Sequence, residues 1–262
     1  MTLYDTMVRD KADLLRRLHT EPELLVLVNV WDVASAKVVA GLPGCRALAT
    51  ASHSIAASHG YEDGEQIPFD LMLAAIGRIV AAVDLPVTAD LEAGYGDVGD
   101  TVRRAVGVGV VGGNIEDQLR PLTEAVAGMR AAVNAAETEG VPFVLNARTD
   151  AFLMTGDRDA DAVLADAIER GRAFLDAGAD CVFVPGKLSA EVIARLVDGI
   201  GQRKVSILAA PDTPSPSELA ELGVARVSFG PWTQRLALTA LADTGAELLR
   251  GDGLPADIRS LS

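Results

Sequence analysis

Cysteine is scarce in this sequence: Cys45 and Cys181 are the only two among 262 residues, and they form no CxxC pair. This pattern excludes a disulfide framework and suits a reducing compartment. The first residues carry several charges and no long apolar run, so no secretory signal is predicted. We therefore expect a cytoplasmic protein.

The sequence also has few positively charged residues and no long apolar runs. The chain has 23 Lys and Arg against 37 Asp and Glu, which gives a formal net charge of −14, and no basic cluster stands out. Nucleic acid and anionic membrane surfaces are therefore poor candidates as partners. No apolar run is long enough to span a bilayer. A small molecule is the more natural partner.

Aromatic residues make up only 4% of the chain, although 49% of the residues are hydrophobic. A core built from Ala, Val, Leu and Ile is typical of α/β folds with buried parallel strands. The apolar runs predict eight strands, at residues 24–30, 47–50, 87–90, 112–117, 143–150, 181–185, 205–209 and 226–230. Helical patterns lie at 5–19, 32–39, 68–83, 100–106, 123–138, 159–176, 189–197, 217–222 and 232–250, and residues 52–66 read as a polar loop.

The alternation of strands and helices predicts the fold class. No hairpin signal joins one strand to the next, so the strands should pair in parallel through right-handed crossovers. Eight such units at this length fit a closed (β/α)8 TIM barrel better than an open doubly wound sheet. Neither GxGxxG nor GxxxxGK[ST] follows the first strand, which argues against a nucleotide-binding fold. No linker-like stretch interrupts the chain, so residues 1–262 are expected to form one domain.

Two carboxylates stand at the exit of the strand at 87–90. Asp90 and Glu92 are two residues apart, and such positions point to one face of an extended chain. Both side chains would then look into one cavity. Neighbouring carboxylates repel each other unless a cation lies between them, and Mg²⁺ is the usual oxygen-seeking candidate. The alternative is that they face solvent beyond the strand end.

Other strand exits carry charges as well. Asp63 follows the second strand, Glu116 and Asp117 end the fourth, and Arg148 and Asp150 end the fifth. In a barrel these ends converge on the rim where active sites of this fold lie. Arg148 can bind a substrate carboxylate through two parallel hydrogen bonds. Its alternative role is a structural ion pair with Glu116 or Asp150.

Two other kinds of site are less attractive. His53 and His59 lack a third ligand at a suitable spacing, which argues against zinc. Cys181 lies within an apolar strand and is better interpreted as a core residue than as a nucleophile.

Five motifs occur in order along the chain: Asn29-Val-Trp-Asp32, His59-Gly-Tyr-Glu-Asp-Gly64, Asp90-Leu-Glu-Ala-Gly-Tyr-Gly96, Asn114-Ile-Glu-Asp117 and Asn146-Ala-Arg-Thr-Asp150. Together they resemble the isocitrate lyase/phosphoenolpyruvate mutase superfamily, over about residues 24–229. The resemblance implies a (β/α)8 barrel, Mg²⁺ with Mn²⁺ as an alternative, and substrates that are 2-oxo acids or become them. It also implies homodimers that exchange the last helix and often pair into homotetramers.

The resemblance also implies roles for the charged residues. Asp90 would bind the metal directly, and Asp63, Glu92 and Glu116 would hold metal-bound waters. Arg148 would bind a substrate carboxylate. Arg148, Asp63 and Glu116 are accordingly the expected catalytic residues.

Substrate binding is expected at the segment Thr50-Ala51-Ser52. In the family, backbone amides and a serine hydroxyl usually hold the 2-oxo acid end there. This chain has Ala51 where that serine is expected, so Thr50 or Ser52 must substitute. Trp31 is also assigned to the substrate site, with packing near a strand end as its alternative.

The connection after the fourth strand departs from the family pattern. The lyases carry a lid loop with a Lys-Cys-Gly-His core whose cysteine is the general acid, and the mutase has a longer loop with a lysine and an asparagine. This chain has Gln118-Leu-Arg-Pro-Leu122 and then a helix, and Pro185 stands where the mutase has a histidine. We expect a Mg²⁺-dependent lyase or decarboxylase that acts on a small 2-oxo or 2-hydroxy dicarboxylic acid, such as oxaloacetate, through an enolate. The alternatives are phosphonomutase-type carbon–phosphorus chemistry and a non-catalytic binder of 2-oxo acids.

Overall fold

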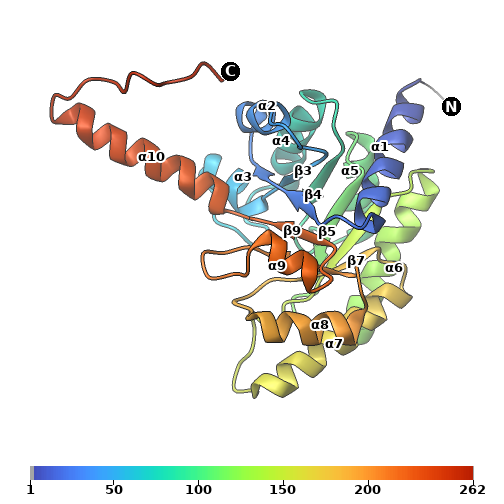
Figure 1. The fold of residues 1–262 in the computed structure, drawn as a ribbon. Coiled ribbons are helices and arrows are strands. Elements are labelled where there is room, and N and C mark those ends of the chain that lie inside the picture. The colour runs from blue at the N-terminus through green and yellow to red at the C-terminus, as the bar shows by residue number, and fades with distance from the viewer. Residues whose placement is uncertain (1–2, 262) are drawn as a thin grey trace.

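The computed structural model describes residues 3–261, which wind a parallel sheet and its helices around one axis (Figure 1). All strand pairs are parallel, in the order β1-β9-β8-β7-β6-β5-β4-β3-β2. The strands are β1 (Leu25–Leu27), β2 (Asn29–Val30), β3 (Leu48–Thr50), β4 (Val87–Asp90), β5 (Gly112–Glu116), β6 (Val144–Arg148), β7 (Cys181–Val184), β8 (Val205–Leu208) and β9 (Arg226–Ser228).

The ring of strands closes through its first segment. β1 pairs with β9 and β2 pairs with β3, and only Val28 separates β1 from β2. The predicted (β/α)8 barrel is therefore confirmed, although the single strand expected at 24–30 is divided in two. That segment is also not fully buried, because Val26 points to the opposite side from Leu25 and Leu27 and is 42% exposed.

Most helices surround the barrel, and at least one helix follows each strand from β2 onward. They are α1 (Leu3–Thr20), α2 (Val33–Ala40), α3 (Ser52–Ser58), α4 (Phe69–Ala81), α5 (Val98–Gly107), α6 (Leu122–Thr138), α7 (Ala160–Asp176), α8 (Ala190–Ile200), α9 (Pro216–Glu221) and α10 (Trp232–Leu249). Polar residues fix several starts, as at α2, where the Asp32 carboxylate accepts from the Ser35 amide and the Ser35 hydroxyl accepts from the Asp32 amide. Buried Ala, Val, Leu and Ile side chains fill the space between helices and barrel.

One predicted loop contains a helix. Residues 52–58 form α3, although they were expected to belong to a polar loop at 52–66. The segment has few apolar residues, but Ile55 and Ala56 are fully buried. Gln234 in α10 supports it from 180 residues away, since its amide donates to the Ser54 carbonyl and the Ser58 hydroxyl. The periodicity of apolar residues in the sequence does not predict a contact between residues so far apart in the chain.

The last helix leaves the barrel. α10 extends away from the ring of strands at the left of Figure 1 and exposes Leu236, Leu238, Leu241, Leu248 and Leu249. The structure describes this helix from end to end, and Gln234, near its start, is its only buried residue. None of the helices within residues 3–261 has the length and apolarity needed to cross a bilayer.

Candidate active site

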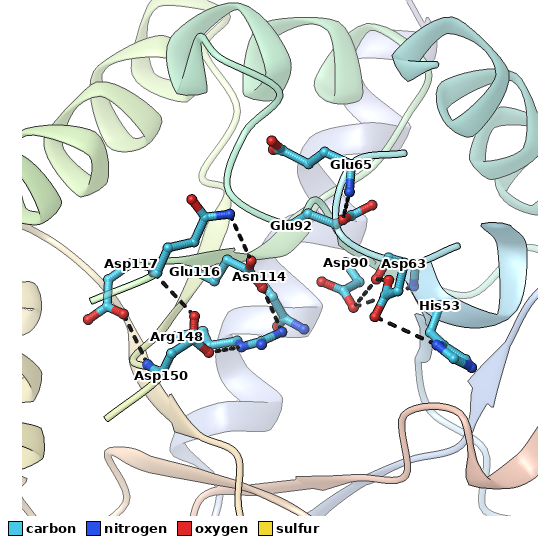
Figure 2. A network of polar contacts seen from close by, with 12 residues as sticks. His53, Asp63, Glu65, Asp90, Glu92, Asn114, Glu116, Asp117, Arg148 and Asp150 are labelled. Atoms are coloured by element: carbon cyan, nitrogen blue, oxygen red, sulfur yellow. Dashed lines mark hydrogen bonds and ion pairs between the residues drawn. The ribbon is translucent and has the colours of Figure 1, made fainter. Parts of the chain in front are cut away.

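A cavity of about 280 Å³ opens at the carboxyl ends of the strands. Asp90 at the end of β4, Asn114 in β5 and Arg148 at the end of β6 contribute side chains to it, and Ser52 and Asp63 come from the region after β3. Figure 2 shows Asp63, Asp90 and His53 on one side, with the group around Arg148 on the other. The predicted convergence of strand exits on one rim is therefore observed for these residues.

A second, larger cavity of about 540 Å³ lies elsewhere. It is lined by residues of α1 and α6 and by the segment before β6, so it lies at the amino ends of the strands. Arg9, Asp13 and Arg16 are among its charged residues, but none of the predicted site residues reaches it. Size alone therefore does not identify the functional site here.

Ser52 connects two of the acidic residues. Its hydroxyl lies 2.9 Å from Asp90 Oδ2 and 3.2 Å from Asp63 Oδ1, and its backbone amide donates to Asp90 Oδ2 at 3.4 Å. A hydroxyl has one proton to donate, so it can satisfy only one of the two carboxylates at a time. The His53 ring lies 3.7 Å from Asp63 Oδ2. Two carboxylates thus meet at the start of α3 with little positive charge between them.

The other oxygen of Asp90 is the best evidence for a cation. Asp90 Oδ1 is buried and has no hydrogen-bond partner among the described residues, which is costly for a carboxylate oxygen unless a missing ligand satisfies it. Within residues 3–261, no three His, Cys, Asp or Glu side chains are close enough to bind one ion together. An ion that keeps several water ligands, such as Mg²⁺, suits this arrangement.

Glu92 does not lie where strand alternation placed it. β4 ends at Asp90, and Glu92 adopts a left-handed backbone conformation with φ of 51°, so the two-residue alternation no longer applies. Its carboxylate accepts hydrogen bonds from the Tyr95 hydroxyl at 2.7 Å and from the Glu65 amide, and it does not line the cavity. Burial, together with the negative charges of Asp90 and Asp63, raises the pKa of Glu92 to about 7.

Arg148 is held between two acids. Its Nη1 lies 2.7 Å from Glu116 Oε2, and its Nε donates to Asp150 Oδ1 at 2.7 Å, so the structural ion pairs considered above are both present. Burial opposes the charge of Arg148, yet Glu116, Asp150 and Asp90 together raise its pKa. Among the described residues Nη2 has no hydrogen-bond partner, so its two N–H bonds remain available to a ligand.

Glu116 contacts this arginine and is not among the residues that line the cavity. Its second oxygen accepts from the Gln118 side chain at 3.4 Å. Burial raises the pKa of Glu116 to about 7, because the attraction of Arg148 offsets only part of the burial and of the repulsion from Asp150 and Asp90. A carboxyl group with this pKa can exist in either protonation state near neutral pH.

Asp117 fixes the short connection between β5 and α6. Its carboxylate accepts from the Leu119 and Asp150 amides at 3.0 Å each and pairs with Arg170 at 3.1 Å. Gln118 and Leu119 both adopt left-handed backbone conformations, which turn the chain sharply into α6 at Leu122. The connection is therefore compact, as its sequence indicated.

The predicted substrate residues separate into two groups. Ala51 and Ser52 line the cavity. Thr50 does not, because its hydroxyl accepts the Asp90 amide hydrogen at 3.0 Å and braces the two strands. Trp31 also lies outside the cavity lining and packs, half-buried, against the core. Trp31 therefore lies where the alternative interpretation, a packing residue near a strand end, places it.

Several cavity residues were not assigned to the site from the sequence, among them His53, which was considered only as a zinc ligand. His53 follows Ser52 by one residue, and Asn29, Asn114 and Arg235 also line the cavity. Asn29 and Asn114 belong to motifs described above, so their strand-end placement is the signal that could have identified them. Arg235 lies in none of these motifs, and its position at the cavity depends on the direction in which α10 leaves the barrel.

The chain was compared with known proteins. The model of the phosphoenolpyruvate phosphomutase family matches residues 15–249. A solved structure from Burkholderia cenocepacia J2315, provisionally described as a phosphonomutase, is similar with a TM-score of 0.85 and 40% identity, covering 93% of this chain and 99% of that one. The structure of oxaloacetate acetylhydrolase in complex with the product oxalate has a TM-score of 0.85 and 28% identity, covering 96% and 91%. Oxaloacetate decarboxylase of Paraburkholderia xenovorans strain LB400 is 29% identical over 240 residues, which is 88% of this chain and 79% of that protein.

Proposed function

The chain belongs to the phosphoenolpyruvate mutase/isocitrate lyase superfamily, and on this premise we propose that it is a Mg²⁺-dependent carbon–carbon lyase. The substrate we propose is a small 2-oxo or 2-hydroxy dicarboxylic acid, with decarboxylation of oxaloacetate to pyruvate as the leading reaction. The observation that carries the proposal is Asp90 Oδ1, which is buried without a partner among the described residues, in a cavity that also contains Arg148. The likeness to oxaloacetate decarboxylase and oxaloacetate acetylhydrolase supports the choice of substrate class.

The acidic residues have different parts in this proposal. Asp90 would bind the cation directly, while Asp63, Glu92 and Glu116 would orient its water ligands. Of these three, Asp63 lines the cavity beside Asp90, and the negative charge of Asp90 contributes to the raised pKa values of Glu92 and Glu116. A bound divalent cation would supply Lewis-acid stabilisation of negative charge on the 2-oxo oxygen.

The substrate would be oriented by Arg148 and the start of α3. The free Nη2 group of Arg148 can donate to a substrate carboxylate, while Glu116 and Asp150 keep the guanidinium in place. Cleavage of the C3–C4 bond then releases CO₂, and its electron pair moves into the carbonyl group to give the enolate of pyruvate. A proton added at C3 completes the reaction.

The short β5–α6 connection favours decarboxylation among the possible reactions. Loss of CO₂ requires no general acid on the departing fragment, and solvent can protonate the enolate. Isocitrate-type cleavage relies on a lid cysteine, but residues 117–121 are fixed by Asp117 and contain none. Phosphonomutase-type transfer needs water to be excluded from the reacting group, and this compact connection offers less cover for that.

We also propose that the protein works as a homodimer or homotetramer through α10. The helix leaves the barrel with five exposed leucines and buries one residue in its own chain. A helix with so much apolar surface requires another partner, and a second copy of this chain is the partner implied by the family resemblance.

A substrate panel tests the proposed reaction. Oxaloacetate, malate and 2-alkylmalates would be incubated with protein and Mg²⁺, and release of pyruvate or glyoxylate would be measured against a reaction containing the metal alone. We expect pyruvate from oxaloacetate above that background. Thermal stabilisation by oxaloacetate without turnover would instead favour the non-catalytic binder, and turnover of a hydroxy acid alone would replace the decarboxylase with an aldol-type lyase.

A further inference from the structure

A buried arginine lies inside the barrel, beneath the cavity, and has no carboxylate partner within residues 3–261. Arg226, the first residue of β9, is 1% exposed. Its Nη2 donates to Asn114 Oδ1 at 3.4 Å, whereas its Nε and Nη1 are buried without partners in the described part of the chain. Interiors of TIM barrels are usually filled with branched apolar side chains, and an unpaired buried charge is costly. Its position therefore calls for an explanation beyond packing.

The charge on Arg226 persists at neutral pH. Burial lowers the pKa of its guanidinium to about 10, while the nearby Cys181 and Asp90 counteract part of that effect. The side chain therefore remains a cation, and each of its N–H groups remains a donor.

This cation fixes how the side chain of Asn114 is oriented. A guanidinium has donors and no acceptor, so the amide atom that faces it must be the carbonyl oxygen. The same oxygen also accepts from Asn146 Nδ2 at 2.8 Å. With two donors on Oδ1, the amide nitrogen of Asn114 is left to face the cavity that this residue lines, and among the described residues Nδ2 has no hydrogen-bond partner.

We propose that Asn114 is a substrate-binding residue that donates a hydrogen bond from Nδ2 to a negatively charged oxygen of the 2-oxo acid end, and that Arg226 is the positioning residue that sets this orientation. The inference rests on the proposed function, which places that end of the substrate beside Asp90. Asn114 pairs directly with Asp90 in the register of β4 and β5. A donor at this position complements an oxygen on which negative charge develops.

Oxalate binding tests the role of Asn114 without requiring turnover. Oxalate resembles the planar 2-oxo acid end, so its affinity for the Mg²⁺-loaded protein would be measured by calorimetry, after the affinity for Mg²⁺ alone. Asn114→Leu keeps a similar volume and removes the donor. We expect an unchanged Mg²⁺ affinity and a loss of about tenfold or more in oxalate affinity, since the lost hydrogen bond is to a charged group.

A matched control is available on the neighbouring strand. Thr88 lies two residues before Asp90, and its buried hydroxyl has no partner among residues 3–261. Thr88→Val therefore also removes a polar group from β4 next to the site, but it should leave oxalate affinity unchanged. An equal loss in Thr88→Val and Asn114→Leu would show a general packing effect and overturn the inference.

The role of Arg226 is tested by a double-mutant cycle. Arg226→Met should weaken oxalate binding by about the factor seen for Asn114→Leu, and the double variant should bind no more weakly than Asn114→Leu alone. Arg226→Lys, which keeps a cation, should lose less affinity and serves in the cycle if the Met variant does not fold. Additive losses would overturn the positioning role.

The outcomes also separate this inference from the proposed function. If wild-type protein with Mg²⁺ binds oxalate and Asn114→Leu binds it equally well, only the present inference is wrong. If the wild-type protein does not bind oxalate at all, the proposed function and the inference both fail.

Discussion

Replacing Asp117 with asparagine should destabilise the fold strongly, although the two side chains have nearly the same shape. Asp117 is 2% exposed, and its carboxylate receives the Leu119 and Asp150 amides and Arg170. Both amides bond to Oδ1, and the carbonyl oxygen of an asparagine could still accept them. The new amide nitrogen would then face Arg170 Nη1 across the 3.1 Å now spanned by the ion pair, placing one donor against another.

The size of the loss follows from what Arg170 retains. Removing one partner of a buried ion pair costs about 3–5 kcal/mol. Arg170 would keep Asp166 Oδ1 at 2.8 Å and the Arg120 carbonyl at 3.0 Å, so we expect the lower end, about 3 kcal/mol. For a chain of this size that corresponds to a fall in Tm of about 6–12 °C.

Urea denaturation followed by tryptophan fluorescence would measure this change in the free energy of unfolding. The matched control is Asp212→Asn, because Asp212 pairs with Lys187 while both side chains are largely exposed. The control should unfold at the wild-type urea concentration, since exposed pairs contribute little. A loss below about 1 kcal/mol in Asp117→Asn would refute the claim that this buried pair stabilises the connection.

Two further predictions concern α10 and a buried histidine. Wild-type protein at micromolar concentration should sediment as a dimer or tetramer. The double variant Leu238→Glu/Leu241→Glu should sediment as a monomer, because charges on the exposed apolar face of α10 oppose the burial of that face against a second copy. A monomeric wild type would contradict this prediction. Burial is the main reason that the pKa of His19 is lowered to about 3. Between pH 6.5 and pH 3 the unfolded chain therefore binds a proton at this residue and the folded chain does not. Over that range His19 lowers the free energy of unfolding by about 1.4 kcal/mol for each unit that the pH falls. In His19→Leu the fall in the free energy of unfolding should be shallower by about that slope over this range, and parallel pH profiles would exclude the effect.

Much of the fold could be predicted because buried parallel strands have a direct sequence signal. β4, for example, was predicted at residues 87–90 and observed there, since a proline and a glycine-rich turn bracket an apolar run. The barrel follows from strict alternation of strands and helices. The break at Val28 was not predictable in this way, because it depends on β1 and β2 pairing with opposite ends of the sheet.

The candidate site was predictable only in part, because strand order can be inferred from the sequence but side-chain direction beyond a strand end cannot. Strand order brings Asp90 and Arg148 to one rim, and this could be inferred from the sequence. The direction in which a side chain points beyond the strand end depends on local backbone conformation, which is why the left-handed conformation of Glu92 was missed. The contact of Asn114 with Arg226 joins residues 112 positions apart and has no local signal.

The central claim is most directly tested by pyruvate release from oxaloacetate with Mg²⁺, measured for wild type, Asp90→Ala and Glu191→Ala after subtracting the metal-only background. Glu191 is an exposed acid in the first turn of α8 and serves as the control. The account predicts activity in wild type and Glu191→Ala, inhibition by oxalate, and background rates in Asp90→Ala even at saturating Mg²⁺, with the variant still folded. Wild-type activity at the background level, or full activity in Asp90→Ala, would contradict it.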